Sequence, residues 1–144
     1  MSGMQENVEV RMRTMRTIWI AMLMSIGFYY AFTFIAKRPE DVEPNRTLFL
    51  VLVTIALLMT FISFPIRNKL INQAIGQQHV PLVQQAYILA WAISEIPALL
   101  GLVYFYMTGN RYYYVLFGMA VFAQLLHIPR REHVINASFK KPLY

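Results

Sequence analysis

Four long stretches of this sequence carry almost no charged residue, and they limit the possible folds more than any other feature. They cover residues 17–36, 47–66, 83–107 and 112–128, and they consist mostly of aliphatic and aromatic residues. A helix needs roughly 20 apolar residues, with about 17–25 tolerated, to cross the hydrocarbon core of a bilayer. In lipid the backbone must satisfy its own hydrogen bonds, so each stretch is expected to be a helix. The stretches are continuous rather than alternating, which argues against a β-barrel.

The overall composition supports a membrane protein. The chain has 144 residues, of which 58% are hydrophobic and only 14% are charged. An average soluble domain has about a quarter charged residues and under half apolar ones. A soluble chain of this length also has too much surface to hide so many apolar side chains. We therefore expect an all-α integral membrane four-helix bundle made of two antiparallel hairpins, with residues 1–144 as a single membrane domain.

The segments between the stretches indicate how the helices connect. In residues 67–80, aliphatic side chains recur at helical spacing among polar ones, which predicts an amphipathic continuation of the second helix. Gly76 is its expected end, and Pro81 is the expected start of the third helix. The four residues 108–111 predict a tight turn, so the third and fourth helices should form a close hairpin.

The basic residues orient these helices. Nine of the 13 Lys and Arg residues lie before the first stretch, between the second and third, or after the fourth: Arg11, Arg13, Arg16, Arg67, Lys69, Arg130, Arg131, Lys140 and Lys141. The positive-inside rule places these segments, and both termini, in the cytoplasm. The expected location is therefore the cytoplasmic (inner) membrane, as a multi-pass protein. The net charge of +6 flanks helices rather than lining one face, so no nucleic acid is expected as a partner.

One acidic residue stands apart from the other six. Glu95 lies near the centre of the stretch 83–107, whereas the remaining acidic residues lie outside the apolar stretches. A charged carboxylate at the bilayer centre costs roughly 2.5–3.5 kcal/mol on insertion scales. The group is therefore expected to stay protonated or to face a polar partner. An ionisable residue at such a position is a candidate functional residue.

Hydroxyl groups at a similar depth, or next to Glu95 in sequence, are its candidate partners: Ser94, Tyr29, Tyr30 and Thr54. Pro97 removes a backbone donor from the same helix, and either loosens the helix beside Glu95 or produces a kink that serves packing. Three roles remain open for Glu95. It binds and releases a proton or sodium ion, it holds helices together by a hydrogen bond worth about 0.6–2 kcal/mol, or it contacts a ligand.

Residues 94–103 read SEIPALLGLV. This segment resembles the carboxylate helix of the c subunits (proteolipids) of rotary ATP synthases, in which a carboxylate is followed by a nearby proline or alanine and by Gly-Leu-Val six positions on. A cytoplasmic polar loop precedes that helix in the family, as residues 67–80 do here. The resemblance implies that Glu95 binds a proton or a sodium ion. The whole chain also resembles small four-helix bacterial membrane proteins with a similar Glu-Pro-Gly-Leu-Val helix, a resemblance that implies no activity.

Other chemistry has little support in the sequence. There is no cysteine, no Ser/His/acid arrangement and no glycine-rich phosphate loop, and His127 lacks a second histidine within the apolar stretches for a haem. We therefore expect no enzyme activity, metal or cofactor. The expected function is an accessory subunit of a larger membrane complex of the bioenergetic kind. Its partners would be the lipid bilayer and either other membrane subunits or copies of itself. Proteolipid-like ion handling by Glu95 is the alternative.

Overall fold

The computed structural model describes residues 2–36 and 45–138 and, within the first helix, the side chains from Val8 onward. Those residues are all-α, as expected. They form five helices: α1 (Ser2–Ile35), α2 (Arg46–Gln77), α3 (Val80–Thr108), α4 (Tyr113–Leu126) and α5 (Arg131–Ser138). The charged residues of the connection 37–44, together with Lys140 and Lys141, lie outside the described residues, so the structure does not show their positions.

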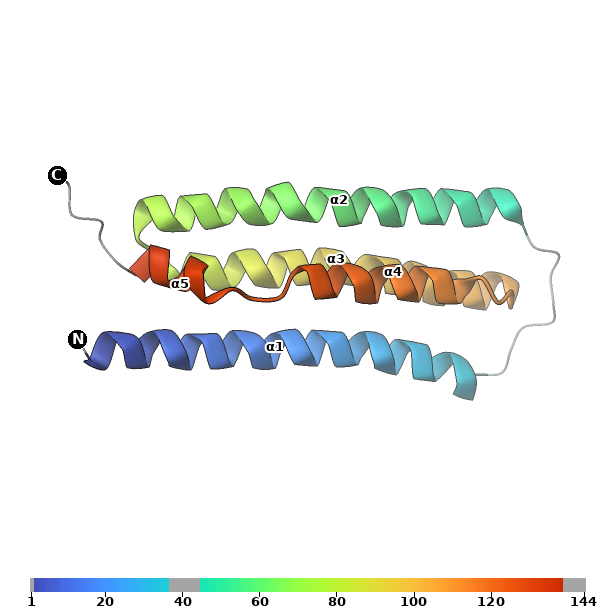
Figure 1. Ribbon diagram of the computed structural model, residues 1–144. Coiled ribbons are helices and arrows are strands. Elements are labelled where there is room, and N and C mark those ends of the chain that lie inside the picture. Colours follow the sequence, from blue (N-terminus) through green and yellow to red (C-terminus); the bar gives the residue numbers. More distant parts are fainter. Residues whose placement is uncertain (1, 37–44, 139–144) are drawn as a thin grey trace.

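The α3–α4 hairpin lies between α1 and α2 (Figure 1). α3 packs against each of the other four helices, whereas no Cα atom of α1 comes within 8 Å of one of α2 over their described lengths. The first two apolar helices therefore do not pack together as the expected hairpin. Small buried residues of α3, namely Ala86, Ala90, Ala98 and Gly101, allow its neighbours to approach closely.

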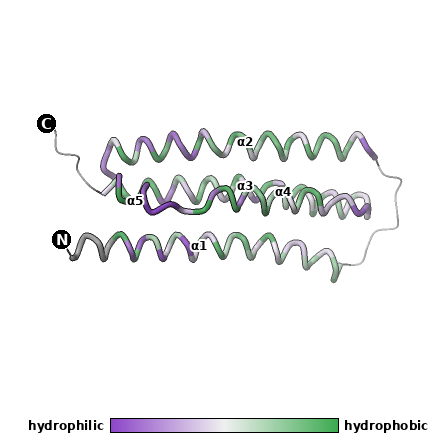
Figure 2. Tube along the Cα trace, viewed as in Figure 1, coloured by the Kyte–Doolittle hydropathy of each residue, from purple (hydrophilic) through white to green (hydrophobic). Residues whose placement is uncertain are grey.

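Three helices, α1 from Val8 onward, α2 and α3, are long and apolar enough to cross a membrane. In the most apolar part of each helix, only 11% of the residues of α1 and of α2 are buried, against 44% of those of α3, so the flanking helices turn most of their apolar side chains outward. Figure 2 shows apolar residues along the middle of the helices and polar ones near α5 and the α2–α3 turn. This pattern indicates a membrane protein.

α4 is shorter than the stretch 112–128 from which it was predicted. It has 14 residues and ends at Leu126. Pro129 has no backbone N–H, and its ring disfavours helical geometry at the preceding residue, so the chain leaves the helix just before it. The following segment turns into α5, a short helix that the hydropathy of the sequence does not predict.

α1 and α2 are longer than the apolar stretches within them. α1 begins at Ser2, and the buried residues Val8, Met12 and Met15 recur at helical spacing before the first apolar stretch. α2 continues through Gly76, the expected end, to Gln77. The left-handed residue that ends it is Gln78, with φ 51° and ψ 43°.

The start of α1, the α2–α3 turn and α5 lie at the same end of the molecule (Figure 1). They share a hydrophobic core that includes Val8, Met15, Ile71, Tyr87 and Val134. At the opposite end, Gly109 adopts φ 61° and closes the turn from α3 to α4, which confirms the tight hairpin expected from residues 108–111.

Candidate functional site

Glu95 lies on α3 and faces α1, where two hydroxyl side chains approach it. The Ser25 hydroxyl is hydrogen-bonded to Oε1 of Glu95. The phenol of Tyr29, one helical turn further along α1, interacts with both Glu95 and Ser25. All three side chains are half-buried. The carboxyl group therefore has polar partners within its own chain.

Ser25 has two acceptors within reach of its hydroxyl. The hydroxyl oxygen lies 2.7 Å from the carbonyl oxygen of Met22 in its own helix and also donates to Glu95 on α3. A serine hydroxyl has one hydrogen to donate, so the two acceptors share it. Ser25 thereby connects the backbone of α1 to the carboxyl group of α3.

The other expected partners lie elsewhere. Ser94 is buried and donates to the carbonyl oxygen of Ala90 in its own helix, at 2.8 Å. Thr54 is exposed on α2 and donates to the carbonyl oxygen of Leu50. Of the four candidates, only Tyr29 interacts with Glu95.

Tyr30, the fourth candidate partner, packs against other aromatic rings. Its ring centroid lies 5.1 Å from that of Phe34 and 5.4 Å from that of Phe117. Pro97 is buried within α3, and the helix continues through it to Thr108.

A second polar cluster surrounds the end of α4. The last carbonyl groups of a helix have no partner within it. Here, side chains of neighbouring helices donate hydrogen bonds to carbonyl groups at this end. The indole N–H of Trp19 donates to the carbonyl oxygen of Gln124 at 3.0 Å, and the indole N–H of Trp91 donates to the carbonyl oxygen of His127 at 2.8 Å. An Arg67 guanidinium nitrogen lies 3.5 Å from the carbonyl oxygen of Leu126. Side chains of α1, α2 and α3 thereby fix the end of α4.

Two polar side chains at this end of α4 are completely buried. The ring of His127 lies between the carbonyl oxygen of Ala123, 2.8 Å from Nδ1, and the hydroxyl of Ser63, 3.1 Å from Nε2. The Gln124 amide has no hydrogen-bond partner for its nitrogen or its oxygen among the described residues. Sequence reasoning did not single out Gln124, because a glutamine inside an apolar stretch has no spacing signal.

A third cluster joins α3 to the segment after α4. The backbone N–H of Arg130 donates to the Tyr87 hydroxyl at 3.1 Å, and that hydroxyl lies 2.7 Å from Nδ1 of His133. The single hydrogen of Tyr87 is then available for Nδ1 of His133 when that nitrogen carries no proton. Burial, followed by the positive charges of Arg67 and Arg130, lowers the pKa of His133 below its usual value, although Glu132 partly opposes this.

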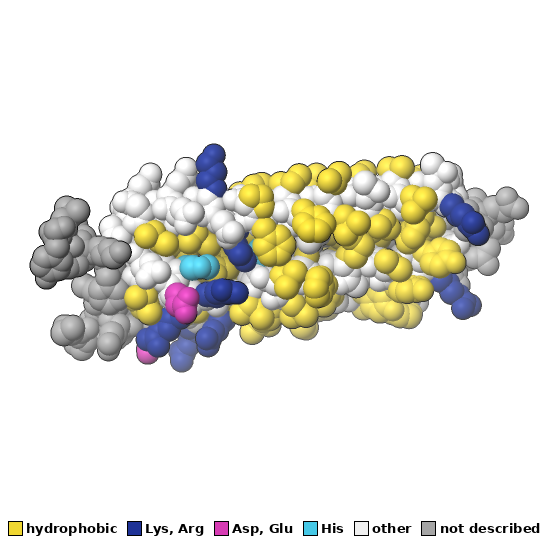
Figure 3. Space-filling view, turned by 45° about the horizontal axis from the view of Figure 1, so that its top comes forward, with side chains coloured by type: hydrophobic (Ala, Val, Ile, Leu, Met, Phe, Trp, Pro, Cys, Tyr) yellow, Lys and Arg dark blue, Asp and Glu magenta, His cyan; other side chains and the backbone are white. Residues whose placement is uncertain are grey.

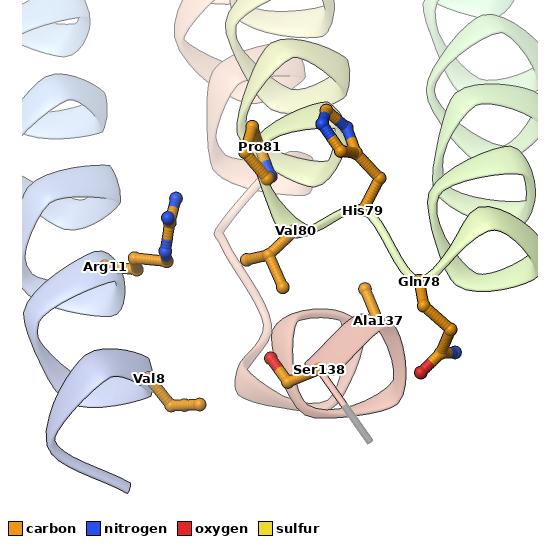
Figure 4. A pocket seen from close by; sticks show the side chains of 8 residues that line it. All are labelled: Val8, Arg11, Gln78, His79, Val80, Pro81, Ala137 and Ser138. Carbon is orange, nitrogen blue, oxygen red and sulfur yellow. The ribbon is translucent and has the colours of Figure 1, made fainter. Parts of the chain in front are cut away.

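A pocket of about 360 Å³ opens near these residues (Figure 4). Val8 and Arg11 of α1, the turn Gln78–Pro81 and the end of α5 enclose it. Among the side chains described, those of residues 8–36 and 45–138, no three His, Asp or Glu residues gather closely enough to hold a metal ion.

No protein-family model, characterised protein or solved structure matches this chain.

Proposed function

We propose that the chain is a non-catalytic accessory subunit of a larger membrane complex, of the bioenergetic kind, in the cytoplasmic membrane. In this proposal α1 to α4 form four membrane spans, with α5 and both termini on the cytoplasmic side. The short α4 spans together with the residues that flank it.

The observation that carries this proposal is the outward apolar surface of the two flanking helices. The described backbones of α1 and α2 lie apart on either side of α3 and α4, and large apolar side chains point away from the bundle, with Phe61 68% exposed and Leu58 54% exposed. Large exposed apolar surfaces mark contacts with lipid or with other proteins. In the plane of a membrane, such faces are available to neighbouring transmembrane helices.

The orientation is tested with single cysteines, because the natural chain has none. Asn72→Cys lies on the exposed face of α2 at the proposed cytoplasmic end, and Arg111→Cys lies in the α3–α4 turn at the other end. In intact cells, a membrane-impermeant maleimide should label only the Arg111→Cys protein. Labelling of Asn72→Cys without lysis would overturn the proposed orientation.

The accessory role is tested by the size of the native assembly. When membranes are extracted with a mild detergent, the tagged chain should migrate in a complex well above its own 16.8 kDa. The double substitution Leu58→Ala and Phe61→Ala should release it, because it removes apolar contacts on the outer face of α2. A chain that migrates alone in extracts of its native membrane would contradict the proposal.

A second candidate function is the handling of a proton or sodium ion by Glu95. The contacts of Glu95 with Ser25 and Tyr29 favour it, because an ionisable residue with polar partners inside an apolar region is a candidate ion-binding group. A site that holds a proton within the apolar region is suited to releasing it when a neighbouring subunit changes the surroundings.

Carbodiimide labelling separates the two functions, because these reagents modify protonated carboxyl groups in apolar surroundings. An ion-handling Glu95 should be labelled specifically, sodium should protect it if sodium binds, and Glu95→Gln should abolish both labelling and ion flux in liposomes. Glu9→Gln is the matched control at an exposed carboxylate. If Glu95→Gln leaves flux unchanged and the assembly intact, the carboxyl only connects α1 and α3.

A further inference from the structure

A positively charged pocket lies where the apolar part of α1 begins. It has a volume of about 370 Å³ and is lined by Glu9, Arg13, Arg16 and Ile20 of α1 and by Arg131 of α5. Arg131 Nη2 lies 3.8 Å from Oε1 of Glu9, and both side chains are more than half exposed. Three guanidinium groups against one carboxylate leave the pocket with a net positive charge.

The position of this pocket follows from the sequence. Arg16 directly precedes the apolar stretch 17–36, and Arg131 follows the stretch 112–128 by three residues. The two elements therefore bring their arginines to the same boundary. Figure 3 shows basic and acidic side chains gathered near one end of the molecule, next to a broad face of apolar side chains.

An apolar groove continues from the same face of α1. It has a volume of about 390 Å³ and lies between α1 and α4, lined by Leu23, Ile26, Gly27, Tyr30, Tyr114, Phe117, Gly118 and Val121. The α1 residues of the pocket and of the groove recur three or four positions apart, which places them on one side of the helix. A Cβ atom added at Gly27 or at Gly118 would have no atom within 4 Å, so the groove is open at both glycines.

The dimensions suit a lipid. Gly27 lies eleven residues beyond Arg16, which is about 16 Å along a helix. One leaflet contributes half of a hydrocarbon core that is about 30 Å thick. The pocket thus lies at the headgroup level. The groove, whose α1 residues from Leu23 to Tyr30 lie about 10 to 21 Å beyond Arg16, lies around the middle of the bilayer.

We propose that the chain binds an anionic phospholipid, with the phosphate headgroup in the pocket and one acyl chain in the α1–α4 groove. Guanidinium groups bind phosphate oxygens through paired hydrogen bonds. Basic pockets on the cytoplasmic side of membrane helices attract anionic headgroups. The pocket is near the small end of the 300–1,000 Å³ range of ligand sites, as suits a headgroup alone. This inference rests on the proposed membrane topology, which the cysteine labelling tests separately.

The test uses the full chain in detergent, titrated with phosphatidylglycerol or with phosphatidylcholine of the same acyl chains, and counts bound lipids by native mass spectrometry. The wild type should retain phosphatidylglycerol preferentially. The triple substitution Arg13→Gln, Arg16→Gln and Arg131→Gln should weaken this retention by about fivefold per arginine. The matched control replaces Arg46, Lys69 and Arg111 with Gln, which changes the net charge equally away from the pocket.

Further variants keep the arginines. Gly27→Leu with Gly118→Leu should fill the groove and reduce retention of long-chain phosphatidylglycerol, while a dihexanoyl analogue should bind as before. Glu9→Gln should increase retention, because it removes the carboxylate that competes for Arg131. Equal retention by the arginine triple variant and its control would overturn the proposal. The pocket would be a site for free anions rather than for a lipid under two conditions. Millimolar inorganic phosphate would displace the bound phosphatidylglycerol, and the glycine-to-leucine substitutions in the groove would leave its retention unchanged.

Discussion

Ser25 on α1 is hydrogen-bonded to Glu95 on α3, 70 positions away in the chain. Ser25→Ala removes this contact while leaving both helices otherwise intact. Polar contacts between membrane helices are worth about 0.6–2 kcal/mol, so we expect a loss of stability in that range. Unfolding of the full chain by SDS titration from a mild detergent measures it.

Thr54→Ala is the control for this substitution. Thr54 is also a hydroxyl residue in an apolar helix, but it is exposed and its hydroxyl donates to the carbonyl oxygen of Leu50 within α2. Its removal should change stability little. A Ser25→Ala effect no larger than that of Thr54→Ala would show that the contact with Glu95 does not hold α1 to α3.

Packing between α3 and α4 depends on one glycine. A Cβ atom at Gly101 would lie 3.0 Å from ring carbons of Phe117 and 3.2 Å from the Cβ of Leu116. Gly101→Ala should therefore cost about 1–3 kcal/mol through overpacking. Gly118→Ala is the matched control, since its added Cβ would meet nothing within 4 Å. It should be neutral, or up to about 1 kcal/mol stabilising from helix propensity. Equal effects in SDS titrations would contradict close packing at Gly101.

The all-α fold and the approximate positions of the long helices could be predicted from the sequence, because charge-free stretches of that length have few alternatives. Helix boundaries were less predictable. Hydropathy marks the part suited to lipid, whereas α1 extends back to Ser2 with Val8, Met12 and Met15 packed into a core beyond it. The spacing of these three residues was a usable signal. The end of α2 had no such signal. Gly76 was expected to end the helix, but Gln78 is the residue that adopts the left-handed conformation there.

The main partner of Glu95 was missed for a different reason. Counting residues from the end of a span gives depth, and it led to Tyr29, which does interact with Glu95. Depth does not say which side of a helix faces a neighbour, so Thr54 was selected although it points away from the bundle. Ser25 lies four residues before Tyr29 and therefore on the same side of α1. That relationship becomes useful only once α1 is known to pack against α3.

The contact between Tyr87 and His133 predicts a dependence of stability on pH. Burial and nearby arginines lower the pKa of His133 in the folded protein, so the unfolded chain takes up a proton first as the pH falls. Stability should be complete above the usual histidine pKa of about 6.5 and should decline as the pH falls below it, levelling off below the folded pKa. His133→Gln should flatten this part of the profile in SDS titrations at different pH. His79→Gln, at an exposed histidine, should leave the profile unchanged. Identical profiles for the His133→Gln protein and the wild type would contradict the assignment.

The buried amide of Gln124 gives the sharpest test of the polar cluster at the end of α4. Both of its polar atoms are enclosed without a partner among the described residues. A buried polar group with no hydrogen bond costs about 1–3 kcal/mol. Gln124→Leu, which keeps a similar volume, should therefore raise stability by about that amount, measured by SDS titration. Gln85→Leu, at an exposed position on α3, is the control and should have little effect. Loss of stability in the Gln124→Leu protein would contradict this cost and show that the amide contributes favourably at the end of α4.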